Sequence, residues 1–325
     1  MTSQTNERPA APVEAVSRSS RPVVQGGASF GNLYRATDPD VVHEALATAW
    51  SLGVRAFDTA PHYGVGLSEE RLGRFLADQP REQFTLSTKV GRLLVDDPDA
   101  PTEADGFVDT PRRRRERDYS AAGVRRSLED SLRRLGLDRV DLVLIHDPED
   151  HLDVAIAEAA PALSAMREEG LIGGYGVGTN FADVALRLVQ ETDLDTVMIA
   201  GRYTLLERTA EELLLPACLE RDVEVQTAGV FNSGLLADPG AAEAHYDYGR
   251  APADLIARAR SMESACRDRG FELRAAALQF PLRHPAVTAV VLGAGTAAEV
   301  RDCHEQLQQP VPEDLWNVLD GLRSQ

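Results

Sequence analysis

Four side chains with different acid–base chemistry stand at or just after the ends of short apolar segments. They are an acid, Asp58; a phenol, Tyr63, five residues later; a lysine, Lys89; and a histidine, His146. An acid and a phenol beside buried apolar residues would cost free energy in a purely structural loop. The spacing therefore favours a chemical role for these residues.

Lys89 is the only lysine among the 34 Lys and Arg residues of the chain. Lysine can lose its proton or act as a compact point charge, and arginine does neither well. Chance survival of one lysine is the alternative. The position of Lys89 at the end of an apolar segment favours a functional group with a perturbed pKa.

These residue types suit proton transfer to or from a carbonyl or carbinol oxygen. Tyrosine titrates near ~10 in water, and a nearby cation such as Lys89 favours the phenolate and lowers that pKa. Asp58 would hold Lys89 in place, and His146 would orient a substrate oxygen. No nucleophile–base pair and no metal cluster accompany them in the sequence, so the electrons must come from a bound hydride carrier.

The chain alternates apolar strands with helices, and this predicts one (β/α)8 TIM barrel over residues 21–325. A doubly wound sheet would carry G-x-G-x-x-G after the first strand, and residues 26–31 do not match it. In a barrel, the carboxyl ends of the strands share one mouth, so the four side chains converge there. The predicted strands are 23–26, 54–58, one ending at 89, 140–146, 174–177, 196–200, 224–227 and 287–292.

Helices and loops fill the intervals. Two long loops are expected at 95–119 and 228–251, and the run of arginines at 112–115, flanked by acids, is interpreted as a solvated loop. Residues 1–20 are rich in Ser, Thr, Pro and Ala, which predicts a disordered tail. The predicted helices are 38–52, one opening at 68, 121–135, 153–169, 181–191, 210–221, and four that begin near 252, 273, 296 and 312.

Composition narrows the class of protein. The net charge of −18 argues against nucleic acid and anionic membranes as partners. No apolar run reaches the ~20 residues of a membrane span. The three cysteines are far apart and lack metal-ligand spacing, which predicts a reduced, cytoplasmic protein. The expected partner is a small-molecule substrate. The oligomeric state is left open.

Residues 58–64, 87–89 and 144–146 resemble the catalytic segments of the aldo-keto reductases, and the resemblance runs from about 23 to 322. It implies a tetrad of Asp58, Tyr63, Lys89 and His146 and an NAD(P) cofactor. By the same resemblance, Thr179 and Asn180 would hold the nicotinamide carboxamide. The segment 293–300 would hold the adenosine phosphates at a helix start, with Gly293, Ala294, Gly295, Thr296 and Glu299 as the cofactor residues.

Two positions depart from the family pattern. Ala200 stands where the family has glutamine, and Ala228 stands where it has the tyrosine that stacks on nicotinamide. Tyr203 and Phe231 are candidates to replace that ring. The loop at Gly295 also lacks the arginine that accompanies NADP preference in the family, and Glu299 adds negative charge, so NAD is expected over NADP. If the protein prefers NADP, Arg301 or Arg274 is the residue expected to bind the 2′-phosphate.

Finer segments, such as 146–148, 201–206 and 231–236, resemble the D-threo-aldose 1-dehydrogenase (L-fucose dehydrogenase) branch, with pyridoxal 4-dehydrogenase close by. The resemblance implies oxidation of the C1 hemiacetal hydroxyl of an aldose to a lactone. Alternatives are pyridoxal oxidation, general aldehyde or ketone reduction and, more remotely, a non-enzymatic regulatory subunit of the same fold. Candidate substrate residues are Tyr34, His62, Asp147 and Asn232, each with an ordinary surface-loop role as the alternative.

Overall fold

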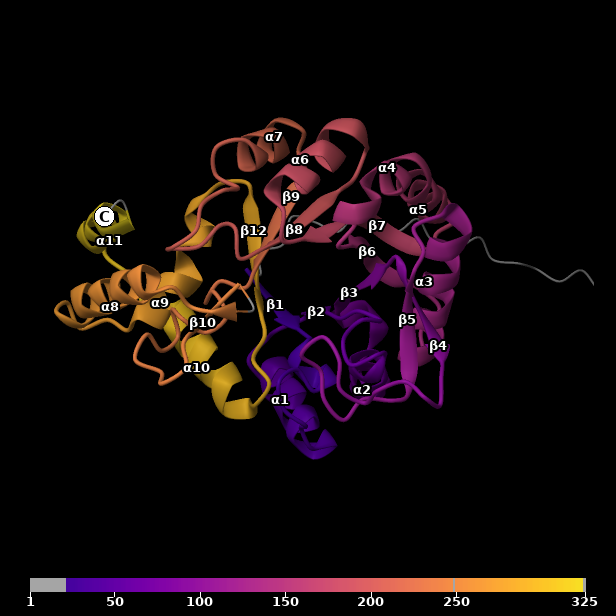
Figure 1. The fold of residues 1–325 in the computed structure, drawn as a ribbon, viewed down its shortest axis with the longest axis horizontal. Helices are drawn as coiled ribbons and strands as arrows, with labels where there is room; N and C mark the ends of the chain where they lie inside the picture. The colour runs from indigo at the N-terminus through magenta and orange to yellow at the C-terminus, as the bar shows by residue number, and fades with distance from the viewer. Residues whose placement is uncertain (1–21, 248, 324–325) are drawn as a thin grey trace, which may run out of the picture.

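Eight parallel strands close into a barrel ringed by helices (Figure 1) in the computed structural model, which describes residues 22–247 and 249–323. The predicted (β/α)8 fold is confirmed. The strand order around the barrel is β1-β12-β9-β8-β7-β6-β3-β2. These strands are β1 (Val23–Gly26), β2 (Ala56–Asp58), β3 (Thr85–Val90), β6 (Val140–His146), β7 (Ile172–Thr179), β8 (Thr196–Ala200), β9 (Glu224–Ala228) and β12 (Val287–Leu292). The predicted tail over 1–20 lies outside the described residues.

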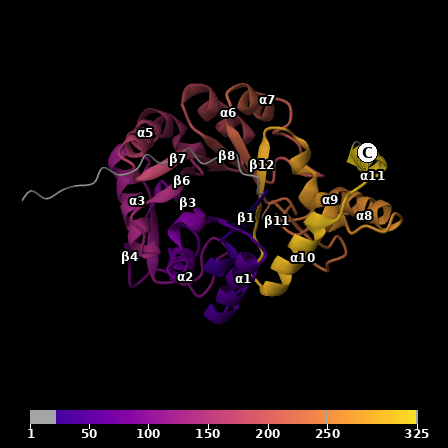
Figure 2. The same ribbon diagram turned by 180° about the vertical axis from the view of Figure 1, so that it is seen from behind.

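The helices follow the strands in the order that the sequence predicts. The helix expected over 210–221 is shorter, because it begins only at Leu214, and the one expected over 153–169 contains a π-helical turn, Ala155–Ala159. The helices are α1 (Pro39–Ser51), α2 (Leu67–Leu76), α3 (Ala121–Leu135), α4 (Leu152–Val154), α5 (Ala160–Glu168), α6 (Ala182–Glu191), α7 (Leu214–Glu220), α8 (Ala253–Arg267), α9 (Leu273–Gln279), α10 (Ala297–Gln308) and α11 (Glu313–Arg323). Seen from behind, α11 lies outside the ring, where it packs on α8 (Figure 2). No helix in the described part of the chain is long and apolar enough to cross a membrane.

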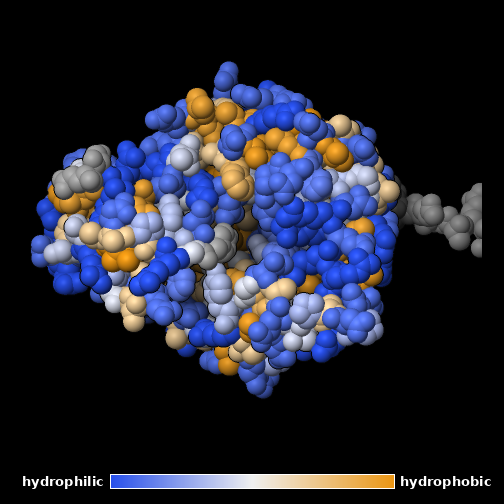
Figure 3. Space-filling view, viewed as in Figure 1, coloured by the Kyte–Doolittle hydropathy of each residue, from blue (hydrophilic) through white to orange (hydrophobic). Residues whose placement is uncertain are grey.

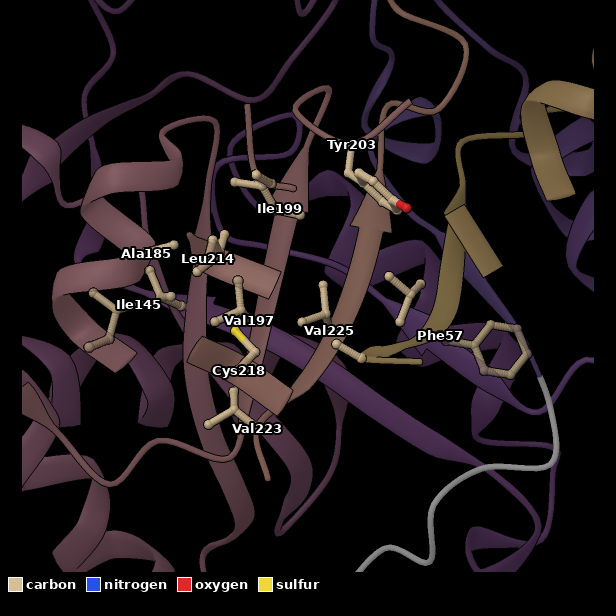
Figure 4. Packing of buried hydrophobic residues seen from close by; sticks show 14 of the residues in the cluster. Phe57, Ile145, Ala185, Val197, Ile199, Tyr203, Leu214, Cys218, Val223 and Val225 are labelled. Atoms are coloured by element: carbon tan, nitrogen blue, oxygen red, sulfur yellow. The ribbon is translucent and has the colours of Figure 1, made fainter. Parts of the chain in front are cut away.

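The core has two parts because a barrel strand points its side chains alternately outward and inward. Outward residues such as Val197 and Val225 are fully buried against helical residues that include Ala185 and Cys218 (Figure 4). A smaller inner cluster, which includes Leu144, fills the barrel itself. The barrel is therefore a packed core, and a site has room only at its mouths.

Strand register sets the placement of the predicted site residues. Asp58 on β2 pairs with Ser87 on β3, and Lys89 pairs with Leu144 on β6. Because β2, β3 and β6 are neighbours, the carboxyl ends that carry Asp58, Lys89 and His146 meet at the same edge of the barrel.

The arginine run was wrongly interpreted as a solvated loop. Three of its arginines, Arg113 to Arg115, lie in β5 (Arg113–Arg117), which pairs antiparallel with β4 (Arg92–Asp96) to form a hairpin. The run is solvated only in part: Arg112 and Arg114 are exposed, whereas Arg113 donates to the carbonyl of Val65 and Arg115 to that of His62. A second small hairpin, β10 (His245–Tyr246) with β11 (Gly249–Arg250), lies in the other long loop.

Gly91 joins β3 to β4 in a backbone conformation that strains any other residue, with φ +100°. A Cβ there would stand 2.2 Å from the ring of Tyr119, whereas one on Gly53, also at positive φ, would meet nothing within 4 Å. We expect Gly53→Ala to cost about 1–2 kcal/mol from backbone strain alone. Gly91→Ala adds the overlap and should cost about 3 kcal/mol or more. Urea unfolding of both variants measures the difference, and equal midpoints would contradict this account of the turn.

Candidate active site

A cavity of about 710 Å³ opens at the carboxyl ends of the strands. Figure 3 shows this face of the molecule hollowed near its middle. The structure brings Asp58, Tyr63, Lys89 and His146 together in its lining. Of the predicted cofactor and substrate residues, the lining also includes Tyr34, His62, Asp147, Thr179, Asn180 and Gly293.

The floor of the cavity holds a buried ion pair. Lys89 Nζ lies 2.6 Å from Asp58 Oδ2 and 2.8 Å from Oδ1, and each side chain is only 2% exposed. Nζ also donates to the carbonyl of Thr59 at 3.0 Å, and Ser87 Oγ donates to Asp58 Oδ1 at 2.7 Å. A buried ion pair is sustained only when such bonds satisfy its remaining polar atoms. The arrangement fixes one positive charge at the base of the cavity.

Tyr63 lies over this charge, with Lys89 Nζ 4.6 Å from the centre of its ring. The charge of Lys89 lowers the pKa of Tyr63, as the sequence predicts, but burial raises it more strongly, to about 12. The expectation of a lowered pKa is therefore wrong for the net shift. Without a bound partner, Tyr63 is a phenol that carries its proton at neutral pH.

His146 stands across from Tyr63, with ring centres 5.8 Å apart in a T-shaped contact. Burial, and then the charges of Arg92 and Lys89, hold its pKa well below the ordinary value. The imidazole is therefore neutral and carries one N–H. Its buried Nδ1 has no hydrogen-bond partner in the described chain. A neutral ring that carries one N–H and lines the cavity can orient an oxygen placed beside Tyr63.

Arg92 is a site residue that the sequence reasoning missed. It begins β4 directly after Gly91, and its guanidinium donates to Asp147 Oδ2 at 2.6 Å and lies 3.2 Å from His62 Nδ1. Its position just after the strand that carries Lys89 was the feature of the sequence that could have identified it. Arg92 carries a fixed charge over the mouth and ties two of the predicted substrate residues together.

The outer wall of the cavity comes from the loop between β4 and β5, whose conformation was not predicted from the sequence. Phe107 is buried, stacks on Tyr63 with ring centres 6.2 Å apart, and meets the ring of His62 edge-on at 5.3 Å. Tyr34 N donates to the carbonyl of Gly106 at 2.7 Å, which joins this loop to the one after β1. Aromatic faces therefore flank the acid–base groups.

Asn180, at the end of β7, contributes a backbone contact that crosses the cavity rim. Arg202 Nε donates to its carbonyl at 2.7 Å, and the other end of the guanidinium pairs with Asp247 at 2.9 Å. The side chain of Thr179 accepts from the N–H of Phe181 at 3.2 Å. Arg202, Asp247 and Phe181 all line the cavity, and none of them was predicted.

The segment at the start of α10 is organised around Glu299. Its Oε2 accepts from the N–H of Gly295 at 2.7 Å and of Thr296 at 3.1 Å, and Thr296 Oγ1 accepts in return from the N–H of Glu299. This capping box fills the helix start with a carboxylate of the chain itself. Gln25 anchors the preceding turn by donating to the carbonyl of Ala294 at 2.9 Å.

The suggested replacements for the missing nicotinamide-stacking ring are wrong. Tyr203 is buried against Phe280, with ring centres 5.1 Å apart, and Phe231 packs against the hydrophobic core. Neither lines the cavity, whereas the two alanines, Ala200 and Ala228, do. The floor at these strand ends is therefore shaped by methyl groups.

Asn232 is also misplaced as a substrate residue. It is buried, its Oδ1 accepts from Thr204 Oγ1 at 2.7 Å, and its Nδ2 lies 3.5 Å from the carbonyl of Gly201. It lines a separate cavity of about 40 Å³ beside the main one. Asn232 therefore ties the loops after β8 and β9 together.

The chain was compared with known proteins. The profile described as the aldo/keto reductase family matches residues 22–324. The chain belongs to this family. It is therefore an NAD(P)-dependent oxidoreductase that acts on CH–OH groups.

Individual relatives cover nearly the whole chain. It is 44% identical over 304 residues to D-threo-aldose 1-dehydrogenase of a Pseudomonas species, covering 92% of each chain. It is 36% identical over 320 residues to pyridoxal 4-dehydrogenase of Microbacterium luteolum, covering 92% of this chain and 93% of that one. The solved glycerol dehydrogenase of Gluconobacter oxydans matches with a TM-score of 0.76 and 25% identity, over 93% of this chain and 90% of that one.

The buried pair gives a prediction that separates stability from chemistry. Lys89→Met leaves Asp58 as an unpaired buried charge, so we expect a loss of about 3–5 kcal/mol. The double variant Asp58→Asn with Lys89→Met removes both charges and should recover most of that loss. Thermal unfolding measures stability, and single turnovers measure activity, which should stay low in both variants. Full activity in the refolded double variant would show that the charge of Lys89 is not needed.

Proposed function

We propose that the protein oxidises the C1 hemiacetal hydroxyl of an aldose to a lactone, with Tyr63 as the group that takes the proton. The observation that carries the chemistry is one phenol held between a buried cation and a neutral imidazole at the barrel mouth. The support for the substrate is the 44% identity with D-threo-aldose 1-dehydrogenase. L-Fucose is the first aldose to test.

Each residue of the proposed tetrad has one task. Lys89 stabilises the phenolate form of Tyr63, this phenolate accepts the proton of the substrate hydroxyl, and Asp58 holds Lys89 in position. His146 donates its N–H to the same substrate oxygen. A nicotinamide cofactor bound in the cavity would supply the acceptor for the hydride. Because the pKa of Tyr63 stands at about 12, oxidation should accelerate as the pH rises above neutrality, since more phenolate is formed.

The residues present suit a dinucleotide cofactor. The cavity runs from Gly27 and Gly293 on one side to Thr179 and Asn180 on the other. Ser29 carries a buried hydroxyl without a hydrogen-bond partner in the described chain, and it lies against Gly295, 3.3 Å from where a Cβ would stand. We propose that Thr179 and Asn180 hold the carboxamide and that residues 293–296 approach the adenosine phosphates.

The lining also suits a hydroxyl-rich ring. Around Tyr63 the polar groups of His62 and Asp147 alternate with the aromatic faces of Phe107 and Tyr34. Aromatic rings pack against the C–H faces of a sugar, and the polar groups bond its hydroxyls. The same rings would also accept a pyridine, so pyridoxal is the second candidate, supported by the 36% identity with pyridoxal 4-dehydrogenase. Reduction of simple aldehydes is a third.

Tyr63→Phe tests the proton carrier. The change keeps the ring and its contact with Phe107 but removes the hydroxyl, so we expect turnover to fall by about 10²–10⁴. Cofactor binding, followed by quenching of protein fluorescence, should change little. The substrates are L-fucose, pyridoxal and glyceraldehyde, followed by absorbance of the reduced nicotinamide. Undiminished turnover in the variant would reject Tyr63 as the acid–base group, and wild-type protein inert to all three would reject the proposed activity.

We propose NAD as the preferred cofactor. Glu299 occupies the helix start and its side chain is about half exposed, so its charge would disfavour a 2′-phosphate bound at this segment. The alternative cations have partners elsewhere: Arg274 pairs with Asp302 at 3.3 Å, and Arg301 lies 3.5 Å from Thr48 on α1. Arg35 forms an ion pair with Glu299 itself, at 3.5 Å.

Glu299→Gln tests this preference because glutamine retains the capping box and removes the charge. Wild-type kcat/KM should favour NAD by about tenfold or more, and the variant should raise kcat/KM with NADP by roughly tenfold. Glu305→Gln, an exposed change on the same helix, is the matched control and should alter neither value. Wild-type protein that prefers NADP would overturn the proposal.

A further inference from the structure

The backbone at Asp147 is held in a conformation that few residues other than glycine adopt. Its φ is +46°, directly after the strand end of His146. Tyr119 Oη donates to the carbonyls of His146 at 2.6 Å and Asp147 at 2.8 Å, and Asp147 N donates to the carbonyl of Gly178 at 2.9 Å. Such outliers persist only when neighbours enforce them, and they concentrate at functional sites. The turn fixes where the carboxylate of Asp147 points.

That carboxylate is anchored through one oxygen. Oδ2 accepts from Arg92 at 2.6 Å and lies 3.5 Å from His146 Nε2. Within residues 22–247 and 249–323, no hydrogen bond is made to Oδ1. The side chain of Asp147 is 25% exposed and lines the cavity. A fixed acceptor with one engaged oxygen therefore stands one residue beyond His146.

Arg92 uses both terminal nitrogens of its guanidinium on neighbouring side chains, while its buried Nε has no hydrogen-bond partner in the described residues. One terminal nitrogen pairs with Asp147, and the second meets His62 Nδ1 at 3.2 Å. Because arginine only donates, Nδ1 of His62 must accept, which leaves the proton on Nε2. Burial and the charge of Arg92 lower the pKa of His62 to about 2, so the ring is neutral. Asp147 then supplies an acceptor and His62 a donor. This combination suits a substrate hydroxyl, which both donates and accepts, better than a substrate carboxylate, which only accepts.

We infer that Asp147, positioned by Arg92, binds the hydroxyl on the carbon next to the reacting carbon and so selects polyhydroxy substrates over simple carbonyl compounds. His146 and Tyr63 bind the oxygen of the reacting carbon. Asp147, the next residue after His146, binds the hydroxyl of the adjacent carbon. The inference rests on the proposed oxidoreductase chemistry at Tyr63, but it does not require that the substrate be a particular aldose.

Asp147→Asn tests the inference with pairs of substrates. Asparagine tolerates positive φ, so the turn is kept, while the ionised acceptor is lost. The pairs are L-fucose with 2-deoxy-L-fucose in the oxidising direction, and lactaldehyde with propanal in the reducing direction, so that each pair differs only in the hydroxyl next to the reacting carbon. The measured quantity is the ratio of kcat/KM within each pair, because a general loss of activity cancels in it.

We expect the wild-type protein to favour the hydroxylated member of each pair by about 10- to 100-fold, the size of one charge-assisted hydrogen bond. Asp147→Asn should reduce that ratio to about threefold or less. Arg92→Met should lower the ratio less than Asp147→Asn does, because Asp147 is still present and Arg92 only positions it. Arg92→Lys should restore part of the ratio. Asp268→Asn, an exposed change beyond α8, is the matched control and should leave both ratios as in wild type.

Three outcomes decide between the explanations. Unchanged ratios in Asp147→Asn overturn the inference. Equal losses on both members of each pair also overturn it, because they assign Asp147 to the support of His146 alone. If wild type leaves L-fucose unoxidised but prefers lactaldehyde to propanal, and Asp147→Asn abolishes that preference, the inference stands and the proposed aldose oxidation is wrong.

Discussion

The buried pair of Asp58 and Lys89 is the interaction on which the rest of the site depends. Removing two charges from water is costly, and the cost is offset only by close contact and by bonds to every remaining polar atom. Here those bonds come from Ser87 and from the carbonyl of Thr59, both placed by the register of β2 with β3. The register that pairs β2 with β3 in the barrel therefore also brings the buried pair and its hydrogen-bond partners together.

The same burial determines the protonation of the groups above the pair. It raises the pKa of Tyr63 to about 12 and holds the pKa of His146 well below the ordinary value, so both groups are neutral without a ligand. Lys89 opposes this effect at Tyr63 but does not overcome it. A ligand that brings further positive charge near the ring would shift the balance toward the phenolate. A ligand of that charge would thus couple proton transfer at Tyr63 to occupancy of the cavity.

The sequence predicted the parts of this protein that follow from short apolar strands and their ends. The barrel and the placement of Asp58, Lys89 and His146 needed only strand order. The hairpin of β4 and β5 was missed because a strand of arginine and glutamate has no apolar alternation. The net pKa of Tyr63 depends on burial by loops such as the one with Phe107, and no local pattern reports that. Tyr203 shows the same limit: its residue type suited the cavity, but its backbone directs it into the core.

The arrangement also explains why the chain uses arginine almost throughout and lysine once. At the rim, each guanidinium joins two partners: Arg92 bridges His62 and Asp147, while Arg202 joins the Asn180 carbonyl to Asp247. A planar group with five donors can do this, and an ammonium on a flexible stem does it poorly. On the floor a compact charge is placed, since Lys89 Nζ lies 2.6 Å from Asp58 Oδ2 and 4.6 Å from the centre of the Tyr63 ring. At the rim arginine joins loops to one another, and the single lysine supplies the compact charge beneath the phenol.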